Sequence, residues 1–265
     1  MAKVIHIAIV EDDPFARNWM TLLAARDWRT RVVIEADRPM KLKTALAKKS
    51  TQIDLVIMDT DIPGDADWLS TIQEVLAPLK RKPKVLCTGV QPNQRVLERL
   101  DKPLFTGYLV KQEISYSIAW AIALAMQNTW VITDGIQALA SAVGFVFPSP
   151  CVVMDGRNTT QHLTRRQAEA ARLAFLFSME RRELADELGI VEDWGFGLVS
   201  AVYDKLGVKD ILNDDQTLDQ YFGNQELILG YVNQIKQDAK GSIKARDMET
   251  LAFHIITMPE TQILT

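Results

Sequence analysis

The chain contains little cysteine and no long hydrophobic segment. Its 265 residues include only two cysteines, Cys87 and Cys151, which make neither a disulfide framework nor a closely spaced metal-binding pair. No apolar run approaches the ~20 residues that a helix needs to cross a bilayer, and the N-terminus enters a strand pattern directly. We therefore expect a cytoplasmic protein that does not associate with a membrane.

The sequence also lacks an excess of charge and the common catalytic motifs. The net charge of −4 gives no global attraction to nucleic acid or to anionic lipid. No Walker loop, GxGxxG loop or nucleophile elbow is present. The chain has three histidines, His6, His162 and His254. Their spacing does not match that of metal ligands. Nothing after residue 128 assembles an acid, a base and a nucleophile, so we expect no enzymatic output.

Short β-rich runs alternate with amphipathic stretches of helical length from residue 3 to about 127. Parallel strands need helical crossovers, and right-handed crossovers place helices on both faces of the sheet. The pattern therefore predicts a doubly wound, five-stranded parallel sheet. The expected strands are 4–10, 31–35, 54–58, 84–88 and 107–110, and the expected helices are 14–26, 39–48, 67–79, 93–100 and 113–126.

The alternation lapses after residue 127. Residues 128–160 carry proline and glycine breakers and predict a linker. From Thr164, a candidate N-cap, the pattern becomes helical and predicts a smaller all-α domain. We thus expect domains at 1–127 and 161–265, the second with an extended helical tail. The expected helices are 165–177, 181–188 and 192–206, followed in the tail by 216–222, 225–237 and 246–256.

Three carboxylates are expected to meet at one edge of the predicted sheet. Asp59 ends the apolar run 53–58, and Glu11 and Asp12 directly follow the first strand. Carboxylates packed together repel one another unless a cation compensates. Mg²⁺ prefers oxygen ligands and keeps several waters. Glu11 or Asp12, together with Asp59 and the backbone carbonyl of Asp61, would suffice to bind it.

Two further polar groups end the fourth and fifth predicted strands. Thr88 offers a hydroxyl, and Lys111 offers a compact ammonium charge. With magnesium, these groups form a site for an anion that bears oxygen atoms. Phosphoryl transfer fits best, with Asp59 as the carboxylate nucleophile, because that chemistry needs positioning and charge stabilisation above all. Asp13 is expected to be a structural residue or a cap of the helix that begins at Pro14.

Residues 3–127 resemble the receiver domain of bacterial two-component response regulators, which has a flavodoxin-like fold. The resemblance rests on the order and spacing of the segments Ile-Val-Glu11-Asp12-Asp13-Pro, Met-Asp59-x-x-Ile-Pro63, the strand-end Thr88 and Gly107-Tyr108-Leu-Val-Lys111. It implies that Asp59 accepts a phosphoryl group from a histidine kinase, with Mg²⁺ held at Glu11, Asp12 and Asp59.

The same resemblance implies that Thr88 and Tyr108 are switch residues. Thr88 would move toward the phosphoryl group, and the ring of Tyr108 would become buried. Two positions depart from the common receiver pattern: Gln112 stands where many receivers have proline, and Asp67 stands where glycine is frequent. The first departure is usual in the NarL/FixJ branch, and the second concerns the geometry of the loop after Pro63.

Residues 163–208 resemble the LuxR/NarL-type helix-turn-helix, whose second helix lies in the major groove of DNA. The matching residues are Leu163-Thr164-x-Arg166 at the start, Gly189 at the turn and Tyr203-x-Lys205-Leu206-Gly207 at the end. The resemblance implies regulation of transcription and a homodimer on activation. The candidate DNA-binding residues are Arg165, Arg166, Arg181 and Arg182.

The charges of this segment depart from those of a DNA reader. Phe196 takes the place of the usual basic residue and Leu198 that of the usual histidine, with Glu192 and Asp193 just before them. Residues 161–208 hold six basic and eight acidic side chains, whereas DNA affinity comes largely from lysine and arginine. Fold without DNA binding is therefore a real alternative.

Three hypotheses for the output remain open. The default is a transcription regulator, the first rival is a signalling adaptor whose helix-turn-helix binds a protein, and the second rival uses the receiver for dimerisation without phosphorylation. If Trp194 and Phe196 pack inward, DNA binding stays open, whereas an exposed Phe196 amid acids favours a protein partner. The apolar faces of the tail helices are expected to pack into the core in preference to forming a dimer or partner surface.

Overall fold

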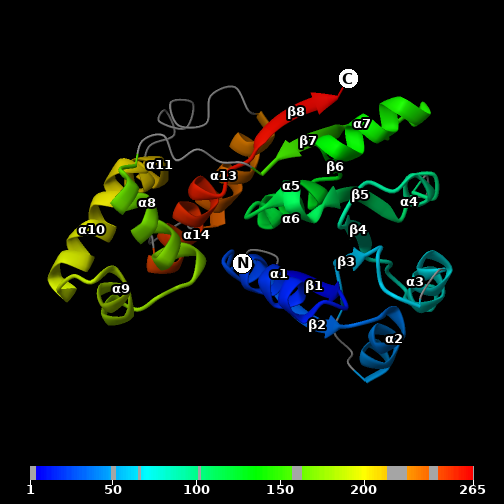
Figure 1. Cartoon of the computed structure of the whole chain (residues 1–265), viewed down its shortest axis with the longest axis horizontal. Helices are drawn as coiled ribbons and strands as arrows, with labels where there is room; N and C mark the ends of the chain where they lie inside the picture. The colour runs from blue at the N-terminus through cyan, green and yellow to red at the C-terminus, as the bar shows by residue number, and fades with distance from the viewer. Residues whose placement is uncertain are drawn as a thin grey trace. The chain divides into compact units, whose positions relative to one another are not determined.

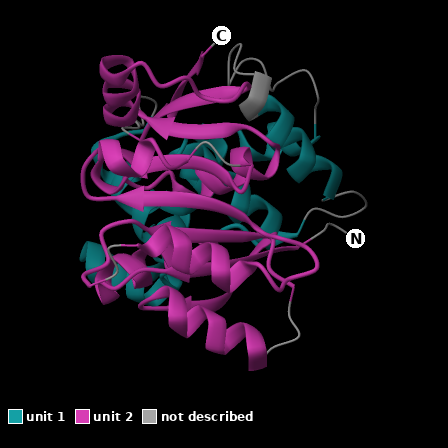
Figure 2. Ribbon diagram, turned by 90° about the vertical axis from the view of Figure 1, so that its right-hand side faces the viewer, with its two compact units in different colours: residues 1–2, 26–28, 158–258 teal, residues 3–25, 29–157, 259–265 magenta. Residues whose placement is uncertain are grey.

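The computed structural model describes residues 4–48, 52–64, 67–100, 103–156, 163–213, 226–238 and 244–264. The chain forms two compact units (Figure 2). Unit 2 comprises residues 3–25, 29–157 and 259–265, and unit 1 comprises residues 1–2, 26–28 and 158–258. The tail helix predicted at 216–222 lies outside the described residues.

Unit 2 is built on an eight-stranded sheet with the order β2-β1-β3-β4-β5-β6-β7-β8 (Figure 1). The strands from β2 to β7 are parallel, and β8 pairs antiparallel with β7. Their bounds are β1 Ile5–Val10, β2 Thr30–Ala36, β3 Leu55–Asp59, β4 Lys84–Gly89, β5 Phe105–Val110, β6 Trp130–Thr133, β7 Cys151–Asp155 and β8 Glu260–Leu264.

Helices cover both faces of this sheet, as the alternating pattern predicts. One core cluster joins α2, α3, α4 and α7 to one face, and α1 packs beside α6 on the other (Figure 1). Alternate strand residues point to opposite faces, so Ala8 and Val10 belong to that cluster while Ile7 and Ile9 are buried on the other face. The helices are α1 Pro14–Ala25, α2 Pro39–Lys48, α3 Trp68–Leu76, α4 Gln94–Leu97, α5 Lys111–Ile114, α6 Ile118–Met126 and α7 Asp134–Val143.

The prediction of a five-stranded sheet is wrong, because three further strands extend it beyond β5. Residues 128–160, expected to be a linker, instead supply β6, α7 and β7. The eighth strand comes from the C-terminal end of the chain, which was expected to belong to the helical domain. These strands are short, and breaker residues separate them, so their apolar runs resemble isolated segments of a loop.

The extension is fitted closely to β5 and α5. A Cβ atom on Gly107 would lie 2.1 Å from the carbonyl oxygen of Val131, so only glycine lets β6 approach β5 at this point. The carboxylate of Glu113 in α5 accepts a hydrogen bond of 3.0 Å from the backbone of Gly135, at the start of α7. The added strands are therefore an integral part of the sheet.

In its described residues, unit 1 consists of helices joined by turns and short loops, and it also includes the short segment Arg26–Trp28. Thr164 caps α8 as predicted, since its hydroxyl accepts from the backbone of Gln167 at 3.3 Å and the Gln167 side chain accepts from the backbone of Thr164 at 3.0 Å. Gly189 ends α9 in the left-handed conformation at φ +60°. The helices are α8 Arg165–Ala171, a π-helical turn Arg172–Leu176, α9 Arg181–Leu188, α10 Glu192–Lys205, α11 Val208–Asn213, α13 Glu226–Asp238 and α14 Ala245–Ile256.

The tail helices bury their apolar faces, which confirms the expectation of core packing. Tyr231 and Val232 of α13 and Leu251 and Phe253 of α14 are almost fully buried. Cys87 and Cys151 are buried free thiols. Among the described helices, none combines the length and apolar character that crossing a bilayer requires.

Replacing Gly107 by alanine tests the close approach of β6 to β5. The new methyl group would collide with the Val131 carbonyl, so we expect the free energy of unfolding to fall by ~2–3 kcal/mol in urea denaturation. The matched control is Gly197→Ala in α10, where no atom lies within 4 Å of an added Cβ, and which should stabilise the protein by ~0.5–1 kcal/mol. Equal stability of the wild type and Gly107→Ala would contradict this account of the extension.

Candidate functional site

The ends of four parallel strands bring the predicted site residues to one edge of the sheet. Asp59, the last residue of β3, pairs in register with Thr88 of β4, and Met58 pairs with Val10, the residue before Glu11. Val110 of β5 pairs with Gly89, so Lys111 follows at the same edge. The strand pattern predicted this convergence, because parallel strands end at a common edge.

Lys111 forms ion pairs with two carboxylates at the centre of the site. Its Nζ lies 2.7 Å from Glu11 Oε2 and 3.1 Å from Asp59 Oδ1. The backbone amide of Asp61 donates a further hydrogen bond of 3.1 Å to Asp59 Oδ1. These contacts orient the Asp59 carboxylate and supply one positive charge to a group of acids.

Glu11 and Asp59 are buried, and burial changes the pKa of Asp59. Glu11 and Asp59 are 0% and 1% exposed. Loss of solvation, followed by the charge of Glu11, raises the pKa of Asp59 to about 7, against the opposing effect of Lys111. Burial by itself lowers the pKa of Lys111, but the hydrogen bond from Lys111 to Glu11 and the charges of both carboxylates raise it overall. Lys111 therefore stays charged while Asp59 holds its proton more tightly than an exposed aspartate.

The donor set fits a hard divalent cation. Glu11, Asp12 and Asp59 offer carboxylate oxygens that all lie within 4.8 Å of one another. Three acids against one lysine leave negative charge in a buried place, and oxygen ligands of this kind suit Mg²⁺. The carbonyl of Asp61 stays a predicted ligand. Its side chain has another role, since Asp61 Oδ2 accepts from the backbone of Val90 at 2.6 Å.

The hydroxyl groups of Thr88 and Tyr108 lie near the acids and differ in their hydrogen bonding. The Thr88 hydroxyl is buried and has no hydrogen-bond partner among the described residues. The ring of Tyr108 is fully buried, and its hydroxyl donates to the backbone oxygen of Gln91 at 3.2 Å. Burial raises the pKa of Tyr108 to about 12, so it is a neutral donor. An unsatisfied buried hydroxyl beside the acids leaves a polar contact open to a ligand.

Arg17 is a contributor that the sequence analysis missed. From α1 its guanidinium donates to the backbone oxygen of Glu11 at 2.6 Å and lies 3.5 Å from that of Asp12, so it holds the loop that carries both acids. Only its place in the first turn of a helix after the acidic loop could have indicated this role. The predicted cap is confirmed, since Asp13 Oδ1 accepts from the backbone of Phe15 at 2.8 Å.

The two departures from the receiver pattern lie on exposed parts of unit 2. Asp67 precedes α3, and its carboxylate is 3.4 Å from the guanidinium of Arg99. Gln112 is exposed, next to Lys111 in α5. Neither departure prevents the ion pair of Lys111 with Asp59 from forming at the centre of the site.

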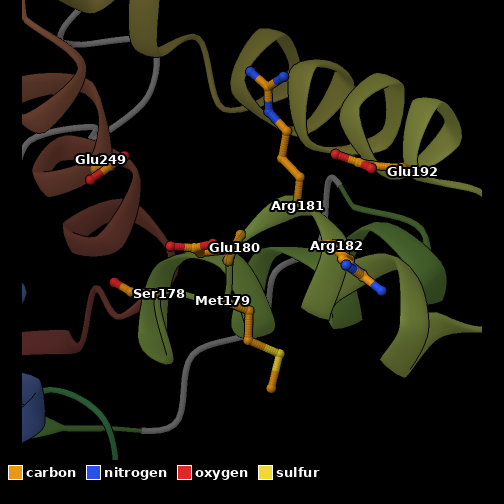
Figure 3. Close-up of a pocket in the computed structure, with 8 residues that line it drawn as sticks. Ser178, Met179, Glu180, Arg181, Arg182, Glu192 and Glu249 are labelled. Atoms are coloured by element: carbon orange, nitrogen blue, oxygen red, sulfur yellow. The ribbon is translucent and has the colours of Figure 1, made fainter.

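In unit 1, the four arginines proposed to bind DNA have unlike surroundings. Arg166 donates to the backbone oxygen of Leu188 at 2.6 Å and so satisfies the end of α9. Arg165 and Arg182 are exposed. Figure 3 shows Arg181 and Arg182 pointing in different directions around a cavity of about 510 Å³ that also exposes acids. Those acids are Glu180, Glu192 and Glu249. DNA binding by this group stays a prediction.

The start of α10 exposes aromatic side chains. Trp194 is 70% exposed and Phe196 52% exposed, and the guanidinium of Arg181 stacks over the Phe196 ring at 4.4 Å from its centroid. Glu192 and Asp193 occupy the first turn of the same helix. Phe196 thus meets the condition that favours a protein partner.

The chain is similar to solved structures of response regulators. RcsB from Salmonella typhimurium, in a structure concerned with conformational dynamism for DNA interaction, has a TM-score of 0.44 and 16% identity, covering 88% of this chain and 99% of that one. RcsB from Salmonella enterica serovar Typhimurium, bound to promoter rprA in the presence of the phosphomimetic BeF₃⁻, has a TM-score of 0.43 and 18% identity, covering 87% and 98%.

A third structure is the response regulator ChrA of a heme-sensing two-component system, with a TM-score of 0.39 and 19% identity, covering 88% of this chain and 98% of that one. No protein-family model and no curated protein sequence matches the chain. At TM-scores this low, only the chain's own residues bear on its function.

Replacing Asp59 by asparagine should stabilise the protein when no divalent cation is present. The pKa of Asp59 rises from 3.8 to about 7 on folding, so the folded state favours the protonated acid. The cost of ionisation grows as the pH rises between these values and is complete above the higher one. At pH 8 in EDTA we expect Asp59→Asn to gain ~1–3 kcal/mol in the free energy of unfolding.

The same comparison below the unfolded pKa should show no gain, because both states then bind the proton. Asp186→Asn, an exposed acid of α9, is the matched control and should change stability little at either pH. If Asp59→Asn gained the same stability at both pH values, the gain would not come from the cost of ionising Asp59, and this explanation would be contradicted.

Proposed function

We propose that the chain is a two-component response regulator in which Asp59 accepts a phosphoryl group from a histidine kinase. The observation that carries this proposal is the buried ion pair of Lys111 with Asp59 and Glu11, at 3.1 and 2.7 Å. A carboxylate nucleophile beside a fixed positive charge suits phosphoryl transfer, which depends on positioning and on neutralising oxygen charges.

Each residue of the site has a separate role in the proposed phosphoryl transfer. An oxygen of Asp59 forms a bond to phosphorus while the phosphorus–nitrogen bond of the phosphohistidine breaks, and the electron pair of that bond stays on the imidazole nitrogen. Lys111 neutralises charge on the phosphoryl oxygens, and the amide of Asp61 holds Asp59 Oδ1. Glu11, Asp12, Asp59 and the Asp61 carbonyl would hold a Mg²⁺ ion, which supplies further charge neutralisation.

The buried hydroxyl of Thr88 carries the signal in this proposal. It has no partner among the described residues, so it is available to donate to an oxygen of the acyl phosphate. Its movement would change the packing beside Tyr108, which is already buried. We expect this change to favour a homodimer, with the protein acting in the cytoplasm and without enzymatic output apart from slow loss of its own phosphoryl group.

Acetyl phosphate with Mg²⁺ should phosphorylate the wild type and not Asp59→Asn. Intact mass spectrometry after each incubation measures the added phosphoryl group. Lys111→Met should lower the rate of labelling by ~10²-fold or more, because it removes the charge beside Asp59. Lys205→Met, an exposed lysine of α10, is the control. Equal labelling of Asp59→Asn and the wild type would refute Asp59 as the acceptor.

A protein partner is the second candidate for the output, and the exposed aromatics favour it over DNA. Trp194 and Phe196 lie in the first two turns of α10 with Glu192 and Asp193. Negative charge at this position repels phosphates, whereas exposed aromatic side chains are typical anchors of protein interfaces. The adaptor hypothesis therefore ranks above regulation of transcription, and its partner would present a basic surface.

Selection of fragments from genomic DNA by the phosphorylated protein should enrich no sequence at either low or moderate salt. The acidic first turn of α10 supplies no basic group to neutralise phosphates, which is the physical reason for this expectation. Enrichment of a common sequence that is lost in Arg182→Ala but kept in Trp194→Ala would restore regulation of transcription as the output.

A further inference from the structure

A second cavity of unit 2 lies directly behind the phosphoryl-acceptor site. It has a volume of about 280 Å³ and lies between α1 and the segment that joins α5 to α6. Thr88 and Lys111 are among the residues that line it. A cavity of ~150 Å³ holds a benzene ring, so this one has room for a bicyclic ring system.

The walls of this cavity are mostly apolar. Leu23 and Met20 of α1 face Ile114 and Ile118 across it, and all four side chains are at least nine-tenths buried. The rim carries Trp19, which meets the ring of Tyr116 edge-on at 5.7 Å between centroids. Such walls favour an apolar body, preferably an aromatic one.

Thr88 and Lys111 give the cavity polar groups that select a neutral head group. The Thr88 hydroxyl is 1% exposed and has no partner among the described residues. Lys111 carries three N–H donors, and its ammonium forms ion pairs with Glu11 and Asp59. An anionic head would meet the carboxylates of those two residues, and a cationic head would meet Lys111 itself. A carbonyl or hydroxyl oxygen satisfies both Thr88 and Lys111 without either repulsion.

We propose that this cavity binds a small, neutral, bicyclic aromatic molecule with one carbonyl or hydroxyl group. The bound molecule occupies Thr88 and Lys111, the residues that must contact the incoming phosphoryl group, and therefore slows phosphorylation of Asp59. This regulatory part depends on the proposed function, whereas binding itself does not.

Calorimetric titration with naphthalene-2-carboxamide tests binding directly. The wild type should bind one molecule, and 2-naphthoate and 2-naphthylmethylammonium should bind ~10-fold or more weakly. Ala16→Leu fills the cavity from α1 and should abolish binding, while Ala25→Leu, at an exposed position of the same helix, should bind like the wild type. No binding to the wild type, or equal binding to Ala16→Leu, would overturn the proposal.

Thr88→Val tests the polar contact with Thr88, since valine keeps the shape of threonine without its hydroxyl. The affinity of Thr88→Val for the carboxamide should be ~5-fold or more weaker than that of the wild type. Its affinity for naphthalene, which has no polar head group, should be unchanged. If Thr88→Val weakened the binding of both ligands equally, or of neither, Thr88 would not select the head group.

The rate of labelling by acetyl phosphate, with and without saturating carboxamide, tests regulation. We expect the wild type to slow by ~5-fold or more and Ala16→Leu to be unaffected by the ligand. Binding without a change in rate would overturn the regulatory part. If the wild type were not phosphorylated even without ligand, the proposed function would be refuted. The calorimetry would still show whether the cavity binds the carboxamide.

Discussion

The contact of the Lys111 ammonium with Glu11 and Asp59 is the interaction on which the site depends. Two buried carboxylates repel each other, and here one lysine compensates both at 2.7 and 3.1 Å. With Asp12, the site holds three acids against this one lysine, and burial, followed by the charge of Glu11, raises the pKa of Asp59. That imbalance explains why the same residues suit a divalent cation and why a neutral molecule is favoured next to Lys111.

The strand that precedes Lys111 adjoins the part of the sheet that the sequence did not predict, since β6 pairs with β5 and the Thr133 hydroxyl accepts from the backbone of Val110 at 3.1 Å. The convergence of Glu11, Asp59, Thr88 and Lys111 followed from strand ends in a parallel sheet, because each strand has a clear apolar run and a polar residue after it. The strands β6 and β7 are short and separated by breakers, and β8 is distant in sequence. Only tertiary contacts, such as that of Glu113 with Gly135, reveal that they complete the sheet.

The helices of unit 1 were easier to predict from the sequence than the charge and exposure of their surface. The helices predicted at 165–177, 181–188 and 192–206 form close to those positions, with Thr164 as the predicted N-cap and Gly189 at the turn after α9. Their surface was less predictable, because a helical stripe in the sequence does not say which aromatics stay exposed. Trp194 and Phe196 are exposed, and Glu192 and Asp193 lie in the first turn of the same helix.

Titration with Mn²⁺, followed by electron paramagnetic resonance, tests the central claim that these acids and Lys111 form one cation-dependent acceptor site. The account predicts a single bound ion in the wild type, at least ~10-fold weaker binding in Glu11→Gln and in Asp59→Asn, and unchanged binding in Asp186→Asn. A wild type that binds no ion, or equal binding by all four proteins, would contradict it.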